Sequence, residues 1–161
     1  MLGAQQLNWD AVSWTAGSTS NTYNIGGVNV TVSITRTGGS STVNSTVTPV
    51  INTTNTGALS PAQNSLFIGS DFTNSSQTVT ITISFSAAVS NVSYSLFDID
   101  RANNQFRDRI VVQATTSAGT INPTGITGLG SSVSFTNSNT LTGTAASGNT
   151  SNAGNATITF N

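Results

Sequence analysis

The stretch GVNVTVSITR, residues 27–36, decides the fold class of this chain. Its apolar residues stand at every second position, with polar residues between them. Successive side chains of a β-strand point to opposite faces, so this period of two predicts a strand with one face in a core and the other in water. A second stretch, QTVTITISFS at residues 77–86, has the same alternation.

Shorter segments along the rest of the chain repeat this signal. No dozen residues carry the apolar stripe of an amphipathic helix, and clusters of Gly, Ser, Asn and Pro separate the alternating segments, as is typical of turns. Further strands are predicted at residues 92–96, 110–114, 133–135 and 158–160, and turns at 37–41, 52–57, 117–119, 122–125 and 146–155. We expect an all-β fold, an antiparallel β-sandwich or jelly roll, with residues 1–161 as one domain.

The ends and edges of this domain raise a question about partners. The last residues, NATITFN, form a good strand without a closing turn, so we expect a domain that lacks a terminal strand or donates one to a neighbour. Edge strands are usually protected by charge, above all by Lys, and this chain has no Lys. Either loops and bulges cover the edges, or strands add between copies of this chain.

The composition excludes several classes of function. There is no His, Cys, Lys or Glu, so the common catalytic triads and dyads and zinc sites built on His or Cys are absent, and we expect no enzyme. Four Arg are too few for a nucleic-acid partner. No apolar run reaches the ~20 residues of a membrane span. The Lys-free, Thr- and Asn-rich composition favours an extracellular or cell-surface location on a bacterium or archaeon.

Six of the nine charged residues lie in one stretch, LFDIDRANNQFRDR at residues 96–109. Asp98 and Asp100 continue the parity of the preceding strand, so their carboxylates are expected on one face about 6–7 Å apart. If residues 91–100 and 108–114 pair as a hairpin, Asp108 returns beside them. Asn103 or Asn104 would complete an all-oxygen shell of the kind that Ca²⁺ accepts. We therefore expect a metal site, with Ca²⁺ as the candidate cofactor, at Asp98, Asp100, Asn103, Asn104 and Asp108.

The charged stretch has two alternative roles that involve no metal. Its three arginines equal the three carboxylates in number, so bidentate Arg–carboxylate pairs could fix a hairpin by themselves. A pair of carboxylates could also hydrolyse a glycoside by acid–base catalysis, although nothing else in the chain supports catalysis.

Two tryptophans are candidates for ligand binding. Trp9 and Trp14 lie five residues apart, and on a regular strand this spacing places them on opposite faces. One ring could pack in the core while the other stacks on a sugar. A carbohydrate-binding module of a secreted protein, with surface glycans as partners, is therefore the alternative function.

The order of these segments resembles a known kind of protein. NWDAVSW, then VSNVSYSLFDID, then DRIVVQA, resembles β-rich modules of large secreted or surface-anchored bacterial proteins. The resemblance implies a further strand after ATITF, and a structural role. We expect a non-enzymatic extracellular module, a repeat or subunit of a cell-surface adhesin or self-assembling fibre or filament, with strand exchange between subunits and stabilisation by calcium as further expectations.

Overall fold

The computed structural model describes residues 4–38 and 47–161, and in this part of the chain it is all-β. All strand pairs are antiparallel, and no helix occurs among these residues. The predicted turn at 37–41 lies largely outside the described residues, from residue 39 onward. The all-β antiparallel prediction is confirmed, and the strands form several separate sheets that are not closed.

The chain divides into two compact units, and each is described by itself. Unit 1 comprises Met1–Thr53 and Gln63–Ala88, and unit 2 comprises Thr54–Ala62 and Val89–Asn161. Residues 54–62 lie in the loop between the strands 50–52 and 65–67. Both strands belong to unit 1, whereas residues 54–62 belong to unit 2. Within the described residues, no helix is long and apolar enough to cross a membrane.

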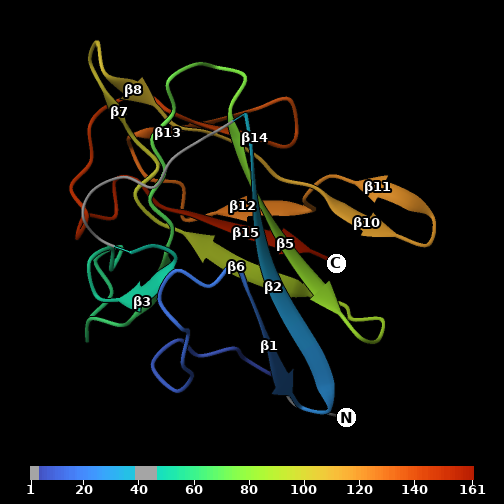
Figure 1. Cartoon of the computed structure of the whole chain (residues 1–161). Coiled ribbons are helices and arrows are strands. Elements are labelled where there is room, and N and C mark those ends of the chain that lie inside the picture. Colours follow the sequence, from blue (N-terminus) through green and yellow to red (C-terminus); the bar gives the residue numbers. More distant parts are fainter. Residues whose placement is uncertain (1–3, 39–46) are drawn as a thin grey trace. The chain divides into compact units, whose positions relative to one another are not determined.

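Unit 1 contains one three-stranded sheet and one short hairpin. The sheet has the order β1-β2-β5, and the hairpin pairs β3 with β4. Figure 1 shows β2 in blue between β1 and the green β5. Gly26 and Gly27 connect β1 to β2, and both have positive φ, which a two-residue hairpin turn of the primed type requires. The strands are β1 (Ser20–Ile25), β2 (Val28–Thr37), β3 (Val50–Asn52), β4 (Ser65–Phe67) and β5 (Thr78–Phe85).

The apolar side chains of β2 and β5 alternate in the same way, but they differ in how deeply they are buried. Val32 and Ile34 of β2 are buried in the core of unit 1 together with Trp14. Their partners in register on β5, Ile83 and Ile81, remain 38% and 47% exposed. β5 is one of the two edge strands of the sheet, so it has a strand neighbour on one side only, whereas the central β2 has one on each side.

Unit 2 contains two three-stranded sheets and two hairpins. The sheets have the orders β12-β15-β6 and β13-β14-β9, and the hairpins are β7-β8 and β10-β11. In Figure 1 the red β15 lies between β12 and β6. The strands are β6 (Val92–Leu96), β7 (Arg101–Ala102), β8 (Phe106–Arg107), β9 (Arg109–Val111), β10 (Ala114–Thr116), β11 (Gly119–Ile121), β12 (Gly125–Thr127), β13 (Val133–Thr136), β14 (Thr140–Gly143) and β15 (Ala156–Phe160).

The last strand of the chain is a central strand of its sheet. β15 pairs with β6 from Ala156 to Phe160, and it pairs with β12 on its other side. Ile158 is fully buried, as the parity of ATITF predicts. Because both edges of β15 have partners within the same chain, β15 has no free edge that a neighbouring copy could pair with.

The core of unit 2 forms around residues that the alternation marked. The buried set includes Val112, Val133, Ile158 and Phe160, with Leu141 fully buried among them. The predicted strand 110–114 is divided between β9 and β10. The break occurs where the amide of Val112 donates to the carbonyl of Asn139 (2.8 Å) instead of to a strand partner.

Candidate functional site

The chain leaves strand β6 just before the first aspartate of the charged stretch. Leu96 is the last residue of β6 and lies in register with Ala156. Asp98 follows with φ of 63°, the left-handed region that Asp adopts more easily than most residues. The predicted continuous strand up to Asp100 is therefore interrupted. The amide of Ile99 then donates to the carbonyl of Gly154 (2.9 Å), and the Ile99 side chain enters the core.

Asp100 and Asp108 face each other at the base of the β7–β8 hairpin. The amide of Asp108 donates to the carbonyl of Asp100 (3.0 Å), and the amide of Asp100 donates to Oδ2 of Asp108 (3.1 Å). The amide of Ser147 donates to Oδ2 of Asp100 (3.0 Å). The juxtaposition predicted from the sequence is thus present, but it is made by the short β7–β8 hairpin rather than by a pairing of 91–100 with 108–114.

Gly143 lets strand β14 approach this hairpin base. A Cβ atom at Gly143 would overlap the backbone carbonyl of Asp100, so no other residue fits without moving the backbone. The close approach also allows the amide of Gly143 to donate to the carbonyl of Asp108 (3.0 Å). The neighbouring strand therefore holds the backbone of Asp108 by a hydrogen bond and packs directly against the backbone of Asp100.

Asp98 is reached by a residue far away in sequence. Nδ2 of Asn55 donates to Oδ2 of Asp98 (2.9 Å), across 43 residues. Asn55 belongs to the 54–62 loop and is 8% exposed. The other oxygen of Asp98, Oδ1, is buried and accepts no hydrogen bond from the described residues. One carboxylate oxygen has therefore lost water without gaining a donor, which is unfavourable for a charged group.

A second amide lies in the same part of unit 2. Nδ2 of Asn155 donates to the carbonyl of Gly57 (2.8 Å), while its Oδ1 is buried without a donor among the described residues. Asn155 directly follows Gly154, whose missing side chain leaves room for the backbone of Asp98. The amide of Thr56 donates to the carbonyl of Asn149 (3.1 Å) and fixes the loop from the other side.

Burial and mutual repulsion make two of the carboxyl groups weaker acids than usual. Loss of water raises the pKa of Asp98, the charge of Asp100 raises it further, and the hydrogen bond from Asn55 lowers it. Loss of water also raises the pKa of Asp108 to about 6; the backbone hydrogen bond from Asp100 opposes this, and the charges of Asp100 and Asp98 add to it. All the charges that contribute to these two pKa values are negative.

The arginines of the same stretch lie on the other face of the hairpin. Arg101 is in register with Arg107, so both side chains share a face. Arg109 is two residues beyond Arg107 and has the same parity, whereas Asp108 between them has the opposite parity. We call Arg101, Arg107 and Arg109 the arginine face. In the described part of the chain, none of the three forms an ion pair with a carboxylate.

The amides predicted as metal ligands are placed elsewhere. Asn103 and Asn104 are exposed in the turn between β7 and β8, and no hydrogen bond among the described residues joins them to a carboxylate. The structure brings Asn55 to Asp98 instead, and Asn155 bonds to Gly57 of the same 54–62 loop. Both lie in segments that the sequence marked only as turns, and no local pattern relates them to the charged stretch.

The two tryptophans differ in how far their rings are exposed. Trp14 is 7% exposed, packs in the core of unit 1 and donates its Nε1 hydrogen to the carbonyl of Ser18 (3.1 Å). Trp9 is half-buried and lies edge-to-face with Tyr23, with 6.0 Å between ring centroids. Trp14 therefore offers no ring face to a sugar, and the expected binding role would rest on Trp9 alone.

The chemistry of the cluster suits a hard cation with mixed oxygen ligands. In the described residues, no three His, Cys, Asp or Glu side chains form a metal site by themselves. Ca²⁺, however, takes six to eight oxygens and accepts amide and backbone carbonyls as well as carboxylates. Asp98 Oδ1 and Asn155 Oδ1 are buried acceptors without donors, so they fit such an ion better than they fit an apolar core.

Comparison with known proteins gives no match: no protein-family model matches the chain, and neither a curated protein nor a solved structure is significantly similar to it.

Proposed function

We propose that this chain is a non-enzymatic structural module of a cell-surface protein, and that a bound Ca²⁺ ion stabilises its second unit. The ion would lie at the acidic cluster, which we define as Asp98, Asp100 and Asp108. The buried amide oxygen of Asn155 would supply a further ligand. The ion would hold together the hairpin base and the 54–62 loop, both of which are hydrogen-bonded to these aspartates.

The observation that carries this proposal is the separation of the six charges. Asp100 and Asp108 face each other at the base of the hairpin, and Asp98 lies near enough for its charge to raise the pKa of Asp108. The arginines lie on the other face. Ion pairing within the hairpin therefore does not neutralise them. A partly buried carboxylate cluster must be balanced by protons or by a cation. The raised pKa of Asp108, about 6, leaves this carboxyl group mostly charged near neutral pH, so a cation is the balancing charge that we propose.

Oxygen ligands and flexible geometry favour Ca²⁺ over other cations. The chain has no His or Cys, so the ligands that transition metals prefer are absent. Mg²⁺ demands near-ideal octahedral geometry and gives up its water reluctantly. Extracellular modules bind Ca²⁺ with dissociation constants of about 10⁻⁴–10⁻³ M. A weak site of this kind would be filled outside a cell.

The surface role is supported by the composition and by strand β5. Six of the nine charges lie in the hairpin region, so the remaining surface is formed mainly by hydroxyl and amide side chains. β5 is an edge strand of eight residues without a charge or a proline, and Ile81 and Ile83 are exposed on it. Such an edge can add a strand from another chain. We propose that the module assembles into a fibre or an adhesin. We also propose that its sheets pack as a sandwich.

Thermal melting with and without calcium tests the proposal. At about 10 mM Ca²⁺, a dissociation constant of about 10⁻⁴–10⁻³ M gives roughly 1.4–2.7 kcal/mol of added stability. For a unit of this size, that free energy raises the melting temperature by roughly 5–20 °C relative to excess chelator. Mg²⁺ at equal concentration should give a smaller increase.

Matched variants separate this site from general ionic effects. Asp98→Asn should abolish the calcium-dependent increase, because it removes a charged ligand and keeps the shape of the side chain. Asp71→Asn, at an exposed position in unit 1, should retain the full increase. Identical melting curves of the wild type in Ca²⁺ and in chelator would contradict the proposed site.

A further inference from the structure

The arginine face is arranged in a way that stability alone does not explain. Arg101 and Arg107 lie directly opposite each other on the β7–β8 ladder. Like charges in register destabilise a hairpin, and no carboxylate in the described part of the chain pairs with either one. Arg109, at the start of β9, follows Arg107 by two residues with the same parity and adds a third positive charge. Three of the four arginines of the chain thus lie on one face without an internal carboxylate partner among the described residues.

The surroundings of the arginine face are rich in hydroxyl and amide groups. Arg109 of β9 is in register with Thr142 of β14, which is in register with Ser134 of β13, so a row of hydroxyl side chains continues from the arginine. The hairpin turn beside it exposes Asn103 and Asn104. Val111, two residues beyond Arg109 and 48% exposed, adds only a small apolar area.

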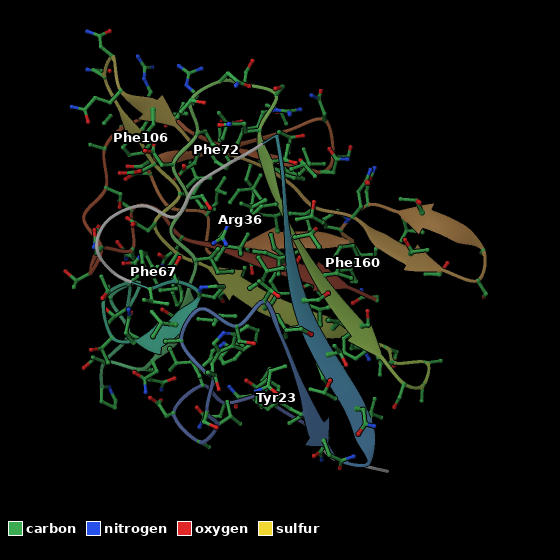
Figure 2. All side chains as sticks on the ribbon, viewed as in Figure 1. Tyr23, Arg36, Phe67, Phe72, Phe106 and Phe160 are labelled. Carbon is green, nitrogen blue, oxygen red and sulfur yellow. The ribbon has the colours of Figure 1, made fainter. Side chains whose placement is uncertain are left out.

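Three arginines among hydroxyl and amide groups do not suit a protein, a membrane or a single-stranded nucleic acid as the partner. A protein interface usually has an apolar or aromatic centre, which this face lacks. Anionic membranes are recognised by about four to eight basic residues, and single-stranded nucleic acid by stacking on aromatic rings. Phe106, labelled in Figure 2, is the aromatic residue of this hairpin, but it has the parity of Asp108 and so lies on the opposite face.

An acidic sugar polymer matches what the face does offer. Its carboxylates can accept two parallel hydrogen bonds from the planar fork of each arginine. Its hydroxyl groups can exchange hydrogen bonds with the neighbouring Thr, Ser and Asn side chains. The described residues provide no aromatic platform on this face, so the charged groups would supply most of the affinity.

We propose that the arginine face binds a carboxylated polysaccharide. The binding surface consists of Arg101, Arg107 and Arg109, with Thr142, Ser134 and the hairpin turn at its border. This surface is distinct from the acidic cluster, which lies on the other face of the same hairpin. It assigns to the module an adhesive role that its calcium site would not provide.

Binding to immobilised hyaluronate, which carries one carboxylate on every second sugar, tests this inference. The full chain is measured by biolayer interferometry in millimolar Ca²⁺, with neutral dextran, chondroitin sulfate and single-stranded DNA as comparison surfaces. We expect binding to hyaluronate and none to dextran. The affinity should fall as salt is raised, because the screening length shortens from about 10 Å at 0.1 M to about 3 Å at 1 M. Chondroitin sulfate, which also bears carboxylates, should bind as well.

Three variants make the test specific to the face. Arg107→Gln should weaken hyaluronate binding about fivefold, and Arg107→Lys should restore it only in part, because Lys keeps the charge and loses the fork. Phe106→Ala, on the opposite face, should bind like the wild type. Thr115→Asp on the β10–β11 hairpin changes the net charge as Arg107→Gln does, and it should also leave binding unchanged.

Several results would overturn the inference. One is the absence of hyaluronate binding by a folded wild-type chain. Another is an equal loss in Thr115→Asp and Arg107→Gln, which would show that net charge alone acts. Tighter binding to DNA than to hyaluronate would assign the face to a nucleic acid. Melting curves of all variants show that the chain is folded in each case.

Discussion

Replacement of Asp108 by Asn should change the stability of the protein in opposite directions with and without calcium. Without calcium, Asp108 is a partly buried carboxyl group whose pKa is raised from 3.8 to about 6. Its charged form is therefore less favourable in the folded chain than in the unfolded chain. Asn removes this charge, and its Oδ1 can still accept the hydrogen bond from the amide of Asp100.

The size of the effect follows from the pKa. One pKa unit corresponds to ~1.4 kcal/mol, so a rise from 3.8 to about 6 sets an upper limit of ~3 kcal/mol at neutral pH. Asp108 is only partly buried, and screening by solvent reduces the expected gain to about 1 kcal/mol. In chelator at pH 7.5, Asp108→Asn should be the more stable protein. In about 10 mM Ca²⁺ it should be the less stable one, because it lacks a charged ligand.

The pH dependence of the wild type provides the matching control. The folded pKa of Asp108 is higher than its unfolded pKa, so the folded chain binds more protons between pH 6 and 4. In chelator, this group makes the free energy of unfolding rise as the pH falls through this window, and the raised pKa of Asp98 acts in the same direction. Bound Ca²⁺ holds the charged form, so it should remove or reverse the rise.

Differential scanning calorimetry is the suitable assay, because it detects unit 2. Both tryptophans lie in unit 1, so their fluorescence reports directly on that unit only. A calcium shift seen by calorimetry in the unit 2 transition would locate the effect. If Asp108→Asn is less stable than the wild type in chelator as well as in calcium, the charge of Asp108 is compensated within the folded chain and this account of the acidic cluster is wrong.

Two further predictions concern packing and assembly. Gly143→Ala should lower the free energy of unfolding by about 2–4 kcal/mol in urea titrations, because its Cβ would overlap the carbonyl of Asp100, whereas Gly148→Ala, with open space around it, should change it by less than ~1 kcal/mol. Self-association at high concentration, measured by analytical ultracentrifugation, should decrease in Ile81→Lys on edge strand β5 and not in the exposed control Leu129→Lys. A wild type that remains strictly monomeric would contradict assembly through this edge.

The charged stretch shows how far local pattern predicts a site. Alternation predicted that Asp98 and Asp100 share one face of a continuous strand, but the strand ends at Leu96 and Asp98 has a positive φ. The predicted return of Asp108 beside Asp100 is present, through the short β7–β8 hairpin. The alternation of side chains along the strand also applies to the arginines, which have the opposite parity to Asp100 and Asp108 and so lie on the other face. The count of three arginines and three aspartates suggested pairing, but alternation across a two-stranded ladder separates the two sets. Strand geometry, rather than the equal number of charges, therefore decides whether the arginines pair with the aspartates.

The sequence by itself determined the strands whose side chains alternate over several residues. The period of two is a local property, so β2, β5, β6, β13 and β15 could be recognised from neighbouring residues alone. Short strands such as β7 and β8 carry too few residues for a period and could not.

Only the tertiary structure decided which distant segments meet at the aspartates. Asn55 lies 43 residues from Asp98, and its position depends on the 54–62 loop joining unit 2. Likewise, the exposure of Ile81 and Ile83 depends on β5 being an edge strand, although their alternation equals that of buried β2. Pairing order and loop placement arise from contacts between segments far apart in the chain, and the period of a single segment contains no record of them.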